Sequence, residues 1–163
     1  MLACVDVDYR PDHAIAACLT FSDWPDSTPG NTFVSRIDDV EPYTPGQFYK
    51  RELPCLLEVL RPVASTLDVV IVDGYVWLGA GRHGLGAHLY EALRRKVAVV
   101  GVAKTEFNGA PAEEVLRGMA SRPLYVTAAG IEVVDAAVHV RSMHGVYRLP
   151  TLLKLVDREC RRG

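Results

Sequence analysis

A strand, helix, strand segment in the middle of the chain limits the folds that this sequence can adopt. Residues 69–72 form an all-apolar run typical of a strand buried on both faces, and a glycine-rich stretch and a helical pattern over residues 85–96 follow it. A second apolar run occupies residues 97–103. Because parallel strands need a crossover helix, this order predicts a parallel βαβ unit in a sheet that is covered on both sides.

Strand-like segments also precede this unit. Residues 2–7, 13–21 and 32–37 are rich in apolar and β-branched side chains, and turn-forming residues separate them. Their short connections predict three sequential antiparallel strands. A helical pattern then begins at Gln47 and ends before Arg61, with Pro54 expected to kink or restart the helix.

The rest of the chain continues the mixture of helices and strands. We expect a weak helix over residues 112–119, a strand over 124–127, a helix over 131–140 and a terminal helix after Pro150. Antiparallel strands followed by parallel β-α units, with helices on both faces, are typical of a ribonuclease H-like mixed α/β sheet. A uniformly alternating doubly wound sheet would show a different order.

Composition limits the function classes. The length of 163 residues and the 49% hydrophobic content suit one domain over residues 1–163. No apolar run reaches the roughly 20 residues of a membrane span, and the four scattered cysteines suit a reducing compartment, so we expect a cytoplasmic monomer. A net charge of −2 argues mildly against a nucleic-acid partner, although basic clusters at residues 94–96 and 158–162 keep that option open.

A G-x-G-x-x-G pattern at Gly79, Gly81 and Gly84 raises the possibility of a nucleotide-binding oxidoreductase. A dinucleotide turn needs its first glycine directly after the strand and an acid at the end of the next strand. Here Gly79 comes six positions after Asp73, and the next strand ends at Lys104. A flexible loop with a helix start at Gly84 is therefore the favoured interpretation.

Carboxylates offer a different site. Asp6 lies in the middle of the first predicted strand, where a buried charge requires compensation, and Asp73 ends a buried strand at the edge where α/β sheets place their sites. In a ribonuclease H-like order these two strands are neighbours, and Glu52 and Asp157 are further candidates. Converging carboxylates of this kind suit Mg²⁺ and metal-assisted hydrolysis of a phosphodiester.

The order of these motifs resembles the endonuclease V (deoxyinosine 3′ endonuclease) family of nucleic-acid repair enzymes. Five stretches are similar to motifs of that family and occur in the same order over nearly the whole chain: CVDVDYR, PYTPGQFYKRELPCLLEVL, DVVIVDG, VVGVAKT and GVYRLPTLLKLVD. The resemblance implies a ribonuclease H-like fold and a metal-dependent endonuclease acting on DNA or RNA.

The resemblance also implies roles for individual residues. Mg²⁺, or Mn²⁺, would be held by Asp6, Asp73 and Glu52, with Asp157 at the late acidic or histidine position of the family's site. Lys104 would stand beside the scissile phosphate, where an ammonium group offsets developing negative charge. These five residues form the predicted catalytic set.

Substrate-binding residues follow from the same resemblance. Tyr43, in the PYTPG loop with Pro45, corresponds to a wedge that enters the duplex beside the altered base, and a stiff aromatic group suits stacking on an unstacked base. Gly46 and Gly74 correspond to positions whose backbone closes around the flipped base. Cleavage would fall one phosphodiester away, on the 3′ side of inosine.

The chain departs from the family pattern after Asp73. Tyr75 and Val76 replace a His-Gly pair, and residues 79–81 occupy the positions of a His-Pro-Arg element, with His83 nearby. The stretch before the first strand is also shorter than the helical N-terminal segment common in the family. The altered loop motivates a second hypothesis, a catalytically weak nucleic-acid-binding homologue with changed base recognition.

Overall fold

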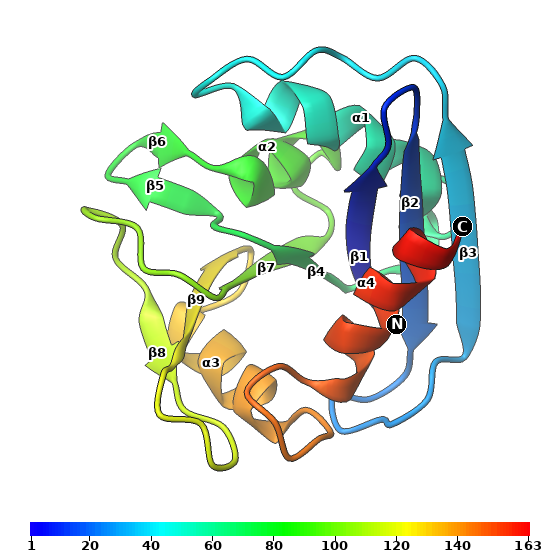
Figure 1. Cartoon of the computed structure of the whole chain (residues 1–163). Coiled ribbons are helices and arrows are strands. Elements are labelled where there is room, and N and C mark those ends of the chain that lie inside the picture. The colour runs from blue at the N-terminus through cyan, green and yellow to red at the C-terminus, as the bar shows by residue number, and fades with distance from the viewer.

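A seven-stranded sheet of order β3-β2-β1-β4-β7-β9-β8 runs through the molecule, and the computed structural model describes all of residues 1–163 (Figure 1). Strands β1 (Leu2–Tyr9), β2 (Ala14–Phe21) and β3 (Asn31–Ile37) pair sequentially and antiparallel. The three N-terminal strands predicted from the alternation of apolar runs and turns are thus confirmed.

Strand β4 (Val69–Asp73) inserts between β1 and β7 (Ala98–Ala103) and is parallel to both. Strand β9 (Leu124–Ala129) returns antiparallel to β7, and the short β8 (Glu113–Val115) closes that edge. The parallel part is therefore confined to β1, β4 and β7. This mixed sheet has the ribonuclease H-like organisation predicted from the sequence.

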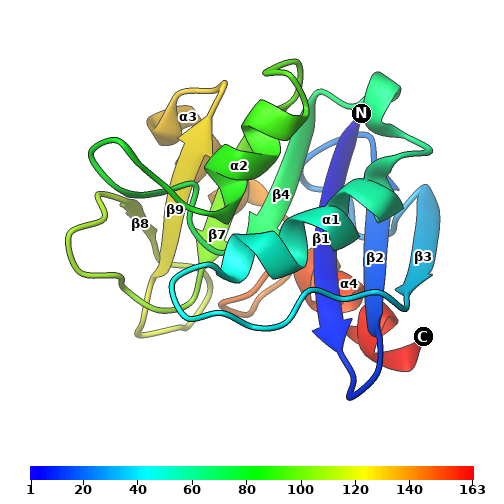
Figure 2. The same cartoon turned by 90° about the horizontal axis from the view of Figure 1, so that it is seen from above.

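Helices cover both faces of the sheet. Helices α1 (Phe48–Leu60) and α2 (Leu85–Ala92) lie on one face, and α3 (Val133–Ser142) and α4 (Thr151–Arg162) lie on the other (Figure 2). A 3₁₀ turn, Ala64–Thr66, follows α1. None of these helices combines the length and apolar character that crossing a bilayer requires.

The pleat of the strands sorts their side chains between two hydrophobic clusters. In β1, Ala3 and Val5 pack against the α1 and α2 side, whereas Leu2 and Cys4 pack against the α3 and α4 side. This alternation follows from the two-residue period of a strand. Asp6, the next even-numbered residue, therefore faces the α4 side.

Two helices differ from the prediction. Helix α2 ends at Ala92 instead of continuing to residue 96, because Arg94 and Arg95 adopt left-handed conformations with φ of 58° and 59°. The helix predicted over residues 112–119 is wrong, because this stretch contains β8 and an irregular segment. Helix α1, by contrast, continues through Pro54 as one element.

The glycine-rich stretch is a small hairpin instead of a flexible loop. Strands β5 (Trp77–Gly79) and β6 (Arg82–His83) pair antiparallel, and α2 begins after Gly84 as predicted. A Cβ atom on Gly84 would collide with the carbonyl oxygen of Tyr75. Close packing of the backbone explains this glycine, so the arrangement gives no support to a dinucleotide turn.

A buried guanidinium joins the segment after β8 to the loop before α4. Arg117 is only 4% exposed, and its Nη atoms donate hydrogen bonds to the carbonyl oxygens of Met143 (2.5 Å), Gly145 (3.1 Å), Tyr147 (2.7 Å) and Arg148 (3.2 Å). Burial lowers the pKa of Arg117. The planar guanidinium, with five N–H donors, suits these four carbonyl acceptors. The ammonium group of a lysine could not reproduce its forked geometry.

We expect Arg117→Ala to lower the free energy of unfolding by about 2–4 kcal/mol, because buried carbonyls lose their donors and a cavity remains. Chemical denaturation at neutral pH measures this loss. Arg61→Ala is the control: Arg61 pairs with Glu58 at the surface, where such a pair contributes at most about 1 kcal/mol. Equal effects of the two substitutions would contradict the structural role of Arg117.

Candidate active site

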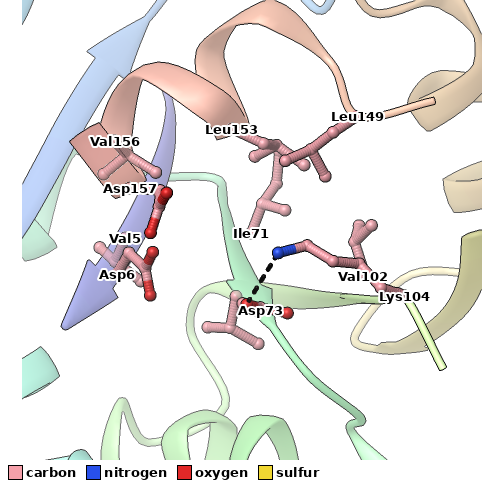
Figure 3. A pocket seen from close by; sticks show the side chains of 11 residues that line it. Val5, Asp6, Ile71, Asp73, Val102, Lys104, Leu149, Leu153, Val156 and Asp157 are labelled. Carbon is pink, nitrogen blue, oxygen red and sulfur yellow. Dashed lines mark ion pairs between the residues drawn. The ribbon is translucent and has the colours of Figure 1, made fainter. Parts of the chain in front are cut away.

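The pairing of β1 with β4 brings Asp6 and Asp73 together toward the C-terminal ends of these two central strands. The parallel register of β1 and β4 runs from Leu2 opposite Val69 to Val5 opposite Val72, so its continuation places Asp6 beside Asp73. Both side chains face the α4 side of the sheet (Figure 3). They line a cavity of about 30 Å³ with these residues: Val5, Ile71, Val72, Val102, Lys104, Leu149, Leu153, Val156 and Asp157.

Helix α4 adds a third carboxylate and a thiol. Asp157 points toward Asp6 from the helix that covers this face (Figure 3). One potential ligand atom from each of Asp6, Asp157 and Cys160 lies within 4.8 Å of the others. Sequence reasoning missed Cys160, because a buried cysteine three residues after Asp157 on an apolar helix face is indistinguishable from an ordinary core residue.

Lys104 brings a positive charge to the same cavity. It follows β7, and its Nζ lies 4.0 Å from Oδ2 of Asp73. Arg148 fixes the backbone at this point by donating hydrogen bonds to the carbonyl oxygens of Lys104 and, at 2.6 Å, Pro123. Arg148 is a second residue that sequence reasoning missed, since nothing in the local pattern relates it to Lys104.

Glu52 lies close to these acids but not in the cavity. It projects from α1, is only 6% exposed, and its Oε2 has no hydrogen-bond partner. Burial raises the pKa of Glu52 to about 8, with further contributions from the charges of Asp6 and Asp73. The charge of Glu52 is therefore coupled to the charges of Asp6 and Asp73. Its carboxylate is not part of the cluster of potential ligand atoms from Asp6, Asp157 and Cys160.

The carboxylates of the cavity are poorly compensated. Burial raises the pKa of Asp6 to about 7, and the charges of Asp73 and Asp157 add to this effect. The pKa of the half-exposed Asp73 is raised by partial burial and by Asp157, against the opposing effect of Lys104. Lys104 lies 4.0 Å from Asp73 and Arg161 pairs with Asp157 at 2.9 Å, but no ion pair reaches Asp6. This is an electrostatic deficit that a bound cation would offset.

A larger pocket adjoins Asp73 on the α1 and α2 side of the sheet. Its volume is about 270 Å³, and its lining includes Asp73, the predicted substrate residues Gly46 and Gly74, and aromatic side chains. Gly46 and Gly74 have φ of +77° and +132°, which favour glycine. Asp73 therefore lies between two cavities on opposite faces of the sheet.

Tyr49 and His83, two rings in the lining of this larger pocket, both contact His88. Tyr49 stacks on His88 with ring centroids 3.7 Å apart, and His88 meets His83 edge to face at 5.2 Å. Burial, followed by the charge of His83, lowers the pKa of His88. These side chains give the pocket flat apolar surfaces with one polar ring, His83, in its lining.

Tyr43 and Pro45 do not line either cavity. Both are exposed in the irregular segment before α1, and 59% of the Tyr43 surface is accessible. Gly46, the next residue after Pro45, is part of the lining of the larger pocket. The segment thus presents an exposed aromatic ring three residues before a residue of that lining.

Side chains in the segment after Asp73 have structural partners. The hydroxyl of Tyr75 donates to the carbonyl oxygen of Thr105 at 2.9 Å and accepts from the backbone N–H of Phe107 at 3.0 Å. Trp77 Nε1 donates to the carbonyl oxygen of Ala128 at 3.0 Å. These contacts tie the segment after Asp73 to the segment that follows Lys104 and to β9.

Metal-free protein should lose stability as pH rises from about 4 to about 8. Because the pKa of folded Asp6 is about 7, above its ordinary value of 3.8, its stabilising contribution is present at low pH and lost through about pH 7. Asp6→Asn should therefore raise the free energy of unfolding in EDTA by about 1–3 kcal/mol at pH 8, and by much less at pH 5. Thermal unfolding at the two pH values measures this difference.

Asp39→Asn serves as the control, because Asp39 is exposed in the segment after β3. It should leave the pH dependence unchanged. Adding Mg²⁺ to the wild type should remove most of the advantage of the Asn variant. An Asp6→Asn protein that is less stable than the wild type at pH 8 in EDTA would contradict the electrostatic deficit.

Comparison with known proteins identifies the relatives of this chain. A profile of the Endonuclease V family matches residues 1–148. The Endonuclease V of Xanthomonas oryzae pv. oryzae is 29% identical over 186 residues, covering 100% of this chain and 78% of that protein.

Solved structures agree in fold. A Ciona intestinalis Endonuclease V bound to a 24mer DNA that contains an inosine followed by a ribo-adenosine superposes with a TM-score of 0.81 at 18% identity, covering 99% of this chain and 84% of that chain. The Streptomyces avermitilis Endonuclease V gives a TM-score of 0.79 at 24% identity, covering 99% of this chain and 79% of that chain. With the profile matching most of its length, this chain belongs to the Endonuclease V family and is an endonuclease.

Proposed function

We propose that this protein is a metal-dependent endonuclease that hydrolyses a phosphodiester on the 3′ side of inosine in DNA or RNA. The observation that carries the proposal is the convergence of Asp6, Asp73 and Asp157 with Lys104 around one cavity at the sheet edge. The inosine-containing DNA in the Ciona intestinalis complex supports the same substrate class.

The acidic side chains fit a divalent cation. Glu52 has a buried carboxylate oxygen without a partner, and Asp6 and Asp73 both have raised pKa values. Oxygen-rich, negatively charged sites are what Mg²⁺ and Mn²⁺ prefer. Asp6, Asp73 and Glu52 would hold the ion, with Asp157 adjacent to Asp6. When bound, Mg²⁺ supplies charge neutralisation and activation of water.

Lys104 acts on the phosphate itself. Its ammonium group is half exposed at the rim of the cavity, 4.0 Å from Asp73, and can turn toward a phosphate oxygen. A positive group at this point stabilises the negative charge that develops as the phosphodiester is attacked. Arg148 keeps the Lys104 backbone in place, so it is a positioning residue.

The larger pocket receives the base. Gly46 and Gly74 allow the backbone to approach a planar ring closely, and Tyr49 contributes an aromatic surface to the lining. Tyr43, exposed beside the pocket, fills the space that the flipped base leaves in the stack. Asp73 lies on the border of both cavities, which sets the base near the cleaved phosphate, one phosphodiester away on the 3′ side.

A second function, binding without efficient cleavage, has one observation in its favour. The β5-β6 hairpin replaces the histidine-rich loop of the family, and it places His83 in the pocket. If this hairpin selects a different base, the protein would bind nucleic acid and cut inosine substrates weakly.

The proposed setting is a cytoplasmic monomer of one domain. Four free cysteines, all buried, suit a reducing compartment.

The decisive experiment incubates the protein with inosine-containing and unmodified oligonucleotides of DNA and RNA, in Mg²⁺, Mn²⁺ or EDTA. We expect nicking near inosine that requires metal, is lost in Asp73→Asn, and falls about 100-fold in Lys104→Met. Glu91→Gln is the matched control, because Glu91 pairs with Arg95 on an exposed face of α2. Gel separation of the products gives the rates and the cleavage position.

Three other outcomes are informative. Tight binding of inosine oligonucleotides without nicking would favour the weakly active homologue. Saturable binding of NAD(P), with neither binding nor nicking of the oligonucleotides, would favour the nucleotide-binding oxidoreductase suggested by the G-x-G-x-x-G pattern. Turnover in a folded Asp73→Asn protein equal to that of the wild type would overturn the assignment of the site.

A further inference from the structure

An exposed tyrosine on the α4 side of the cavity has no role in the site described so far. Tyr147 lies in the loop before α4 and is 66% exposed. The Nζ of Lys154 lies over its ring, 4.4 Å from the centroid. We call Tyr147 and Lys154 the Tyr147 platform.

The platform lies next to the acidic cavity. Arg148, the residue after Tyr147, donates a hydrogen bond to the carbonyl oxygen of Lys104, and Leu149 lines the cavity (Figure 3). Lys154 precedes Asp157 by three residues on α4, so the two side chains lie on neighbouring turns of one helix face. Both members of the platform thus adjoin residues of the proposed site.

Buried contacts hold the loop of the platform rigid. Arg117 donates to the carbonyl oxygens of Tyr147 and Arg148 at 2.7 and 3.2 Å from a position that is almost fully buried. A Cβ atom on Gly118 would collide with the carbonyl oxygen of Val146, so the two loops are in close contact. An ordered backbone that exposes an aromatic ring is preorganised for binding, because little entropy is lost when the ring is covered.

The surroundings suit a nucleic-acid strand. Lys154 covers one face of the Tyr147 ring and adds positive charge, and Arg148 adds another cation nearby. Val146, the residue before Tyr147, is also exposed and adds an apolar side chain to this loop. An aromatic face with adjacent cations is the combination that binds single-stranded nucleic acid by stacking and phosphate contact.

We propose that the Tyr147 platform stacks on a base of the cleaved strand, beyond the scissile phosphate. The inference rests on the proposed function. The larger pocket binds the altered base on the α1 and α2 side of Asp73. Lys104, 4.0 Å from Asp73, contacts the scissile phosphate. A strand that continues past Lys104 reaches the α4 side, where Tyr147 lies. The platform therefore holds the 3′ arm, and Tyr43 works on the opposite side of the cut.

The test varies the length of this arm. Binding is measured by fluorescence anisotropy in an Asp73→Asn background, with inosine oligonucleotides that carry a 3′ arm of about ten nucleotides or end two nucleotides after inosine. Tyr147→Ala should weaken binding of the long oligonucleotide about tenfold and leave the short one unchanged. Tyr147→Trp should restore binding of the long oligonucleotide, and Lys154→Met should reduce both its affinity and the salt dependence of that affinity.

Two comparison variants make the result specific. Tyr43→Ala should weaken binding of both oligonucleotides to the same degree, and Val134→Ala, which removes an exposed apolar side chain from α3, should change neither. An effect of Tyr147→Ala that is absent, or equal for the two lengths, overturns the platform while the nuclease assignment stands. Absence of nicking by the wild type overturns the proposed function instead.

Discussion

The parallel pairing of β1 with β4 is the constraint on which the rest of the structure depends. It places the N-terminal hairpin against the central βαβ unit, and its register sets Asp6 beside Asp73. Sliding one strand by a single residue would turn Asp6 to the opposite face of the sheet, because side chains alternate along a strand. The apolar clusters on both faces oppose such a slip, so packing of the core also fixes the geometry of the carboxylates.

In this arrangement, the carboxylates repel one another at the place where the chemistry is proposed to occur. Asp6, Asp73 and Asp157 approach one another, Lys104 and Arg161 lie near Asp73 and Asp157 only, and burial raises the pKa of Asp6. A core without these acids would be more stable at neutral pH. Retaining them is understandable if a divalent ion completes the site, since binding energy then offsets the repulsion.

Much of this site follows from local sequence patterns, and the remainder depends on distant contacts. Strand-end Asp73 can be predicted, because an apolar run stops there, whereas the role of Lys104 is implied only by the resemblance to the family. Arg117 could not be, because its acceptors lie 26 to 31 residues further along the chain. The helix expected over residues 112–119 fails for the same reason: its apolar Leu116 and Met119 are exposed, while the charged Arg117 is buried.

The acids of the proposed site come from residues 6, 52, 73 and 157, so they span almost the whole chain. During synthesis the first three acids emerge long before α4, which covers the cavity and carries Asp157 (Figure 3). A nascent chain that has not yet completed this helix can pair its strands but leaves the cavity open to solvent. Completion of the acidic cluster is thereby tied to the formation of α4.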